Sequence, residues 1–358
     1  MADTALATAL QVQKWLKNYY AEYVRSSGFL GSMGTGTNSI IQVKRDLTDA
    51  GKSVNIPLIT RLKGAGVVGK NQLAGNEEAL GNFNQNIAVD FLRHAVVIDK
   101  VDEQWTEIDL LGAAKDALTT WAADKLRDAI IAALGSIDGV VYGTANATQK
   151  NAWTTNNVDR VLFGNAVGNY NATHATALNN VLGTMKMTAS VVSLMKRIAK
   201  TADPHIRPTR VNNQMNREYF QMFCGSMTFR DLKNDTVMQN ANREARPRDV
   251  EANPIFQDGD LIYDGVIIRE IPEIAGFNNT AGTVVRIEPV YLCGAQAVGL
   301  VWGQEPKTIK DDFDYGRRKG IGTEEVRGVD KLRFGTGSAG ALKDHGVVTG
   351  FMAAPLDA

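Results

Sequence analysis

A strand-like excursion over residues 53–99 constrains the fold of this chain more than any other stretch. Two arms rich in Ile, Val and Leu, residues 54–62 and 86–99, enclose a polar middle that contains Gly64, Gly66, Gly69 and Gly75. Because this middle is too long for a tight turn, the pattern predicts a long two-stranded ribbon with an irregular tip. An isolated two-stranded ribbon is only marginally stable in water, so we expect it to lie on a neighbour.

The clearest helical pattern follows, over residues 106–134. Thr106 is a good N-cap with Asp109 three residues later, close to a capping box, and Gly135 is a natural stop. At about 1.5 Å per residue the helix is a rod on the order of 40 Å, long for a globular domain. A single apolar stripe runs along it: Leu111, Ala114, Leu118, Ala122, Leu126, Ala129 and Ala133.

The N-terminal residues predict an arm. Residues 5–25 have the spacing of an amphipathic helix, and the glycine-rich residues 26–39 without periodicity predict a loose joint after it. A helix followed by such a joint at a terminus is more typical of an arm than of the start of a compact domain. The apolar face consists of Leu6, Ala9, Leu16, Tyr19 and Tyr23.

The remaining segments mix helices and strands. We expect loop or irregular structure over residues 138–180, a helix from Thr188 that ends before Pro204, and a second helix over 228–244. Strand-like patterns cover residues 217–224, 261–271, 283–292 and 320–334. The predicted fold class is therefore α+β with mixed or antiparallel sheets.

The composition excludes several classes of protein. Lys and Arg together number 39 and so do Asp and Glu, which argues against a dedicated nucleic-acid binder with its basic surface. Neutrality also removes long-range repulsion between copies of the chain. Cys224 and Cys293 are far apart and predict buried thiols in a reducing cytosol. The sequence has neither a secretion signal nor an apolar run long enough for a membrane span, so we expect no membrane association.

The loop from Gly64 to Lys70 is the motif closest to enzymatic chemistry. It fits G-x-G-x-x-G and nearly fits the phosphate-binding G-x-x-x-x-G-K-[ST], but Asn71 replaces the residue that would hold Mg²⁺. Both motifs also need a helix to begin at the loop, and residues 72–80 have no sustained apolar stripe. A flexible loop tip is the favoured interpretation, and a P-loop or dinucleotide-binding enzyme is the alternative.

The other polar clusters do not form a catalytic or metal-binding arrangement. Asp311, Asp312 and Asp314 lack the spacing of a calcium loop and predict a solvated acidic turn. The four histidines are scattered, Glu77 and Glu78 have no acid–base partner, and Ser338 is out of register for a nucleophile elbow. We therefore expect no catalytic residue, no cofactor and no metal.

Several strings of this sequence resemble, in the same order, the major capsid proteins of tailed phages of the phage N-four type. The resemblance covers roughly residues 50–335, and it does not extend to the N-terminal arm or to residues 138–180. The strings are Ile56-Pro-Leu-Ile-Thr-Arg-Leu-Lys-Gly-Ala-Gly-Val-Val-Gly, Leu73-Ala-Gly-Asn-Glu-Glu-Ala-Leu, Arg93-His-Ala-Val, Ile206-Arg-Pro-Thr-Arg-Val, Arg217-Glu-Tyr-Phe, Arg230-Asp-Leu-Lys-Asn-Asp, Asn253-Pro-Ile-Phe, Tyr263-Asp-Gly-Val-Ile-Ile-Arg-Glu, Leu292-Cys-Gly-Ala-Gln-Ala-Val-Gly and Asp314-Tyr-Gly.

This resemblance implies the Hong Kong ninety-seven-like capsid fold, which tailed phages share with the floor of the herpesvirus capsid. Residues 1–52 would be the N-terminal arm, 53–99 the extended E-loop, and 100–204 the peripheral domain with the spine helix 106–134. Residues 205–300 would form the axial domain, and residues 301–358 would return as strands to the peripheral domain and end in a tail. The glycines of the supposed P-loop would then lie at the tip of the E-loop.

The resemblance also implies a function. Copies of the chain would assemble into hexamers and pentamers of an icosahedral head shell that encloses double-stranded DNA, in the virion, after assembly in the bacterial cytoplasm. Expected partners are a separate scaffolding protein, a portal, a cement protein and DNA contacted without sequence specificity, and we expect copies to be held together non-covalently. The inter-subunit residues of the E-loop would be Arg61, Lys63, Gly64, Gly66, Gly69, Lys70, Gly75, Glu77 and Glu78.

Overall fold

A computed structural model describes residues 28–45, 47, 51–106, 108–210, 218–244 and 261–357, without side chains for 242–244. The predicted N-terminal helix 5–25 and the string at Asn253 lie outside these residues. The described chain divides into two compact units. The smaller unit contains residues 91–125 and 304–326, and the larger unit contains 28–90, 126–303 and 327–357. None of the described helices is both long and apolar enough to cross a membrane.

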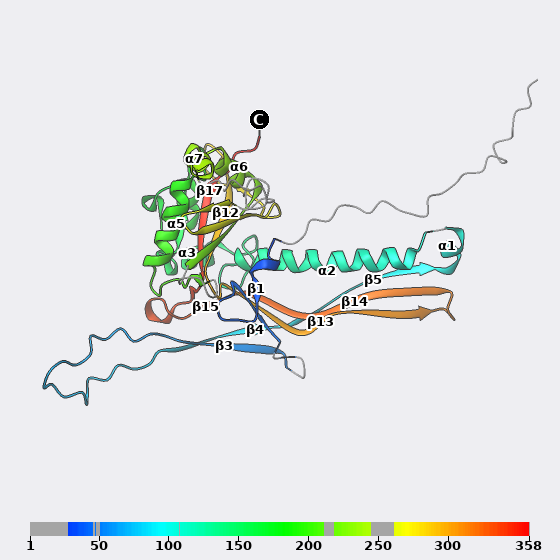
Figure 1. Cartoon of the computed structure of the whole chain (residues 1–358), viewed down its shortest axis with the longest axis horizontal. Coiled ribbons are helices and arrows are strands. Elements are labelled where there is room, and N and C mark those ends of the chain that lie inside the picture. Colours follow the sequence, from blue (N-terminus) through cyan, green and yellow to red (C-terminus); the bar gives the residue numbers. More distant parts are fainter. Residues whose placement is uncertain are drawn as a thin grey trace, which may run out of the picture. The chain divides into compact units, whose positions relative to one another are not determined.

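The smaller unit packs a helix on a sheet of long strands (Figure 1). Its strands are hydrogen-bonded in the order β13 (Val298–Phe313), β14 (Arg318–Lys331) and β5 (Asp90–Asp99). Ala114 and Leu118 of α2 (Leu110–Leu134) are buried against Ile321 of β14. The alanines of the predicted stripe thus let the helix lie close to the strands.

The long helix begins later than the sequence predicts. Thr106 follows a separate short helix, α1 (Lys100–Trp105), whose N-cap is Asp99. The side chain of Asp109 accepts a hydrogen bond from the Gly112 amide at 2.9 Å, so Asp109 caps α2. Thr106 was predicted as the N-cap, but aspartate is an equally good one, and it is Asp109 that has this role. The predicted stop is confirmed, since α2 ends at Leu134 and Gly135 follows.

A mixed sheet forms the centre of the larger unit, which confirms the α+β class. The hydrogen-bonded order is β6-β17-β12-β8-β10-β9, with β7 paired to β8 and β11 to β12. The strands are β6 (Val161–Phe163), β7 (Thr209–Arg210), β8 (Glu218–Cys224), β9 (Leu261–Tyr263), β10 (Val266–Glu270), β11 (Phe277–Asn278), β12 (Arg286–Cys293) and β17 (Val347–Ala353). Smaller pairings in this unit include β1 (Met33–Gly34) with β2 (Ile41–Lys44), β2 with the start of β13, and β15 (Arg333–Phe334) with β16 (Lys343–Asp344).

Helices cover this sheet on both faces. On one face α5 (Ala189–Thr201), α6 (Ser226–Asn234) and α7 (Thr236–Glu244) bury apolar side chains against β8, β12 and β17 (Figure 1). The end of α2 packs on the other face, where Ile130 and Leu134 join Tyr291 and Cys293. Residues on β12 alternate between the faces as the pleat requires. The expected burial of both cysteine thiols is confirmed.

The predicted helix from Thr188 is confirmed, with Thr188 as N-cap of α5. The predicted helix 228–244 is instead two helices, because Asp235 between α6 and α7 has an extended backbone. One carboxylate oxygen of Asp235 accepts a hydrogen bond from the Ala189 amide at 2.7 Å and the other from the Val237 amide at 3.2 Å. This single side chain therefore caps the first turns of both α5 and α7.

The prediction of irregular structure over residues 138–180 is wrong. The segment contains α3 (Ala147–Asn156), β6 and α4 (His174–Asn179). Asn146 and Gln149 form a capping box at the start of α3, a signal that the sequence carries. β6 has only three residues, all buried, and pairs in parallel with β17. Packing against the sheet, and not local pattern, therefore decides the structure of β6.

A buried histidine anchors α4 to α3. One ring nitrogen of His174 lies 2.9 Å from the Tyr142 hydroxyl and the other 2.8 Å from the Thr154 hydroxyl. Burial, assisted by the charge of Lys150, lowers the pKa of His174 to about 4. Burial and the charge of Arg160 likewise lower the pKa of His345 to about 4.

We expect these histidines to make the fold less stable between pH 6.5 and pH 4. The unfolded chain takes up their protons near pH 6.5 and the folded chain only near pH 4, so the stabilisation is complete above pH 6.5 and is lost as the pH falls through that window. A shift of this size corresponds to about 3 kcal/mol for each group. Urea unfolding at pH 7, 5.5 and 4 should show a smaller pH-dependent loss for His174→Gln than for the parent chain. An identical pH dependence in the two proteins would contradict the assignment for His174.

Candidate functional site

The ribbon, defined as residues 53–88, is the candidate site. β3 (Ser53–Ile59) pairs antiparallel with β4 (Asn82–Ala88), from Ser53 opposite Ala88 to Ile59 opposite Asn82. The predicted second arm was one strand over 86–99, but it is split at Val89, and β5 joins the sheet of β14. Residues 60–81, which we call the ribbon loop, contain neither helix nor strand. The Thr60 amide closes the loop by donating to the Gly81 carbonyl at 2.9 Å.

The base of the ribbon is fixed to the larger unit. Ile56 and Ile87 are buried in a cluster with Val301 and Leu332. The Gln85 side chain adds hydrogen bonds of 3.0 Å to the Lys331 carbonyl and 2.6 Å from the Arg333 amide. The buried apolar side chains and these hydrogen bonds fix the position of β3 and β4 in the larger unit.

The ribbon loop is braced from within by Glu78. Its two carboxylate oxygens accept hydrogen bonds from the amides of Lys63, at 2.7 Å, and Gly64, at 2.5 Å. These two backbone bonds lower the pKa of Glu78 below its usual value, so the carboxylate stays charged. Glu77 accepts in the same way from the Gly75 amide at 2.8 Å. Both predicted glutamates therefore act on the backbone of the loop.

Two basic residues tie the start of the loop to Asp203. Lys63 Nζ lies 2.6 Å from one carboxylate oxygen of Asp203, and Arg61 lies 3.8 Å from the other. The hydrogen bond from Lys63, assisted by its charge and that of Arg61, lowers the pKa of Asp203. All three side chains are about half exposed, so the contacts orient the loop and add little stability.

The glycines give the loop its shape. Gly66, Gly69 and Gly75 have φ angles of +73°, +74° and +92°, a region that favours glycine, and no atom lies within 4 Å of where a Cβ would be. Gly64 differs, because a Cβ there would meet the Glu78 carboxylate at 2.7 Å. Three of the predicted glycines are thus needed for turns and the fourth for the approach of Glu78.

The ribbon loop lacks the geometry of a nucleotide site. No helix begins after Lys70, since residues 71–81 have no regular structure. The backbone amides of Lys63, Gly64 and Gly75 are already bound to the glutamates Glu77 and Glu78. A phosphate would therefore meet two carboxylates and no helix N-terminus.

Five large apolar side chains on the ribbon were missed by the sequence reasoning. They are 57–77% exposed to solvent, which is unusual for a set of aliphatic residues in one segment. They were missed because they are scattered among glycines and polar residues, without the regular spacing that would place them on one face of a strand or helix. The residues are Ile59, Leu62, Val68, Leu73 and Leu80.

We expect Glu78→Ala to loosen the base of the loop. The amides of Lys63 and Gly64 would lose their acceptor, and their hydrogen exchange should become about fivefold faster or more. Exchange measured by NMR or mass spectrometry tests this, with Glu77→Ala as the matched control that should affect only Gly75. Equal exchange at Gly64 in parent and variant would contradict the brace.

Comparisons with known proteins agree with this architecture. Residues 3–356 match the model of a family described as phage capsid protein. A major capsid protein of Pseudomonas phage KPP25 is 27% identical over 98% of this chain and 97% of its own length. Both matches span nearly the whole chain, including the ribbon.

Solved capsid structures resemble the chain as well. The cyanophage Pam1 capsid asymmetric unit contains a chain that is 45% identical, with a TM-score of 0.90 and full coverage of both chains. The capsid of Ralstonia phage GP4 has the same fold, with a TM-score of 0.76 at 21% identity and full coverage. The expectations of a capsid fold, a virion protein and a structural protein in place of an enzyme are thereby confirmed. The chain belongs to the phage capsid protein family and is a major capsid protein of the tailed-phage type.

Proposed function

We propose that this capsid protein assembles as hexamers and pentamers into an icosahedral head shell, and that the ribbon loop is the element by which each copy holds a neighbour. In this proposal the ribbon is the greater part of the E-loop, residues 53–99, and the chain is a capsid protein of the phage N-four type that its sequence resembles. The nine predicted residues from Arg61 to Glu78 would shape and orient the loop. The exposed aliphatic residues would supply most of its contact area.

One observation carries the proposal: Leu62, Val68, Leu73 and Leu80 are exposed on a loop whose two-stranded stem pairs with no third strand among the described residues. Apolar groups of this number on one segment favour a partner surface, because burying them removes their unfavourable contact with water. A second copy fits this role, since the chain has no net charge to oppose association.

The same proposal assigns the rest of the chain. Residues 1–52 would be the arm, 53–99 the E-loop, 100–204 the peripheral domain, 205–300 the axial domain, and 301–358 the strands that return to the peripheral domain. A separate scaffolding protein, a portal and a cement protein would be its partners, and packaged DNA would be contacted without sequence specificity. Copies would be held together without a covalent cross-link.

Charge placed on the loop tests the proposal. In Val68→Asp/Leu73→Asp the subunit should fold normally, because both side chains are already exposed, whereas closed particles seen by electron microscopy should fall at least about tenfold. Val284→Asp is the matched control, since Val284 is 61% exposed outside the ribbon. Normal particles from the double variant would refute the role of the loop.

A further inference from the structure

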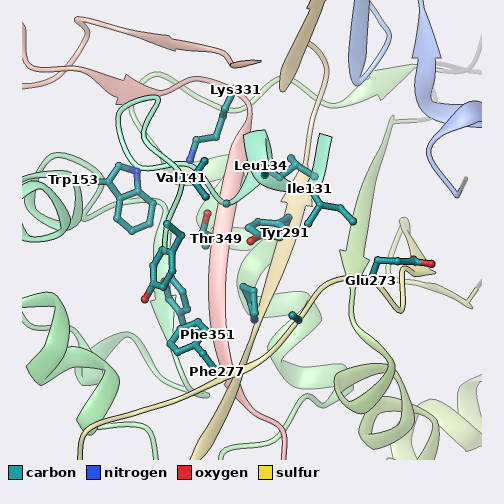
Figure 2. Close-up of a pocket in the computed structure, with 15 residues that line it drawn as sticks. Ile131, Leu134, Val141, Trp153, Glu273, Phe277, Tyr291, Lys331, Thr349 and Phe351 are labelled. Carbon is teal, nitrogen blue, oxygen red and sulfur yellow. The ribbon is translucent and has the colours of Figure 1, made fainter. Parts of the chain in front are cut away.

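A cavity of about 280 Å³ lies in the larger unit, apart from the ribbon loop (Figure 2). It is bounded by the end of α2 and the loop that follows it, by α3, by β12, β14 and β17, and by the segment that precedes β12. None of residues 60–81 lines it. Its lining includes Leu134, Tyr142, Phe277, Tyr291, Thr349 and Phe351.

Aromatic rings form one wall. The ring centroid of Tyr142 lies 5.1 Å from that of Phe277 and 6.1 Å from that of Phe351. Ile131 and Leu134 of α2 face the space from the other side (Figure 2). An apolar cavity of about 150 Å³ can hold benzene, so this one has room for a larger ring system.

Polar groups meet at one end of the cavity. Tyr291 and Thr349 are cross-strand partners on β12 and β17, and their hydroxyl groups lie on the same side of the two strands (Figure 2). Thr349 is 4% exposed, and its hydroxyl has no hydrogen-bond partner among the described residues. Buried hydroxyls are normally satisfied, so an unsatisfied one beside an open space points to a missing acceptor or donor.

The charges around the cavity are already balanced. Lys331 Nζ lies 2.7 Å from Asp344 and donates to the Ser136 carbonyl at 2.7 Å. At the rim, Glu273 is paired with Arg127 at 3.4 Å. A charged ligand would have to displace one of these pairs, so the site fits a neutral molecule.

We propose that this cavity binds a small neutral aromatic compound with one hydrogen-bonding group, such as an indole or a phenol. The ring would lie against Tyr142, Phe277 and Phe351, and its polar group would bond to the Thr349 hydroxyl. Binding would connect the end of α2 to β12 and β17 through the ligand.

Indole titrated into the full-length chain tests the proposal. We expect saturable heat in calorimetry and a melting temperature that rises with indole concentration, because the ligand binds only the folded chain. Thr349→Val keeps the shape of the site and should weaken binding about fivefold, the effect of one lost neutral hydrogen bond. Ala132→Leu, which fills the cavity from α2, should abolish binding.

A second cavity supplies the control. It has a volume of about 320 Å³, shares Tyr142 and Phe277 with the first, and is lined by Ala147. Ala147→Leu should therefore leave the indole affinity unchanged. The proposal fails if no saturable binding occurs at the solubility limit of indole, if Thr349→Val and Ala132→Leu bind like the parent, or if Ala147→Leu alone removes binding.

Discussion

Lys331→Met is expected to lower the free energy of unfolding by about 3–5 kcal/mol, the typical cost of removing one partner of a buried ion pair. Lys331 and Asp344 are 0% and 2% exposed, and their charged atoms lie 2.7 Å apart. Without the ammonium, the Asp344 carboxylate would keep one hydrogen bond from the part of the chain that the structure describes, that from Trp153 Nε1 at 3.1 Å. The pair joins β14 to β16, and Trp153 of α3 donates to the same carboxylate, so loss of the pair should destabilise the larger unit as a whole.

Urea unfolding of the purified chain measures this effect. Lys307→Met is the matched control, because Lys307 is exposed on β13 and its loss should change stability by less than about 0.5 kcal/mol. Lys331→Met/Asp344→Leu removes both charges and should recover part of the loss. A change below about 1 kcal/mol in the single variant would show that the buried pair does not have this role.

Deletion of residues 63–76 is expected to leave a folded subunit and to abolish closed shells. The deletion removes exposed side chains and the half-exposed contact between Lys63 and Asp203, while the register of β3 with β4 and the buried Ile56 and Ile87 remain. The folded state should therefore lose no more than about 1 kcal/mol. Assembly should fail, because Val68 and Leu73 are removed with the loop.

Circular dichroism and electron microscopy of the same preparation separate these two outcomes. A second variant, in which residues 64–75 are replaced by an equally long Gly/Ser segment, keeps the reach of the loop and removes its side chains. It should also fail to close shells if contacts matter more than length. Normal particles from either variant would contradict the role of the loop.

Local signals in the sequence predict the fold where one element has one clear cap or stop. α5 begins after Thr188 and α2 ends before Gly135, as the sequence indicates. The start of α2 was misplaced because Asp99, Thr106 and Asp109 all fit the pattern of an N-cap, and only the structure shows which of them have that role. The prediction of a single helix over 228–244 was wrong for a similar reason, because Asp235 caps α7 within this range and also caps α5.

Elements whose stability comes from distant contacts were not predictable. β6 is three buried residues that exist as a strand because β17 pairs with them. β13 was missed, because Gly303 and Pro306 interrupt its pattern. Beyond Val301, β14 is the one strand among the described residues that pairs with β13, so a proline on the open edge is tolerated. The predicted acidic turn is partly confirmed: Asp314 begins the turn, whereas Asp311 and Asp312 lie exposed on β13.

The candidate site was found by its glycines and not by its contact residues. Gly66, Gly69 and Gly75 mark the loop because their positive φ angles require glycine, which is a local property. The aliphatic side chains between them have no period, since they do not face a core of their own chain. Their importance becomes visible only when their exposure is known.

The structure of the assembled particle by cryo-electron microscopy is the most direct test of the central claim. In a closed shell, residues 61–80 of each copy should lie on a neighbouring copy, with Leu62, Val68, Leu73 and Leu80 buried at that contact. The account would be contradicted if the purified chain formed no shell with its assembly partners, or if these side chains remained exposed to solvent in the finished shell.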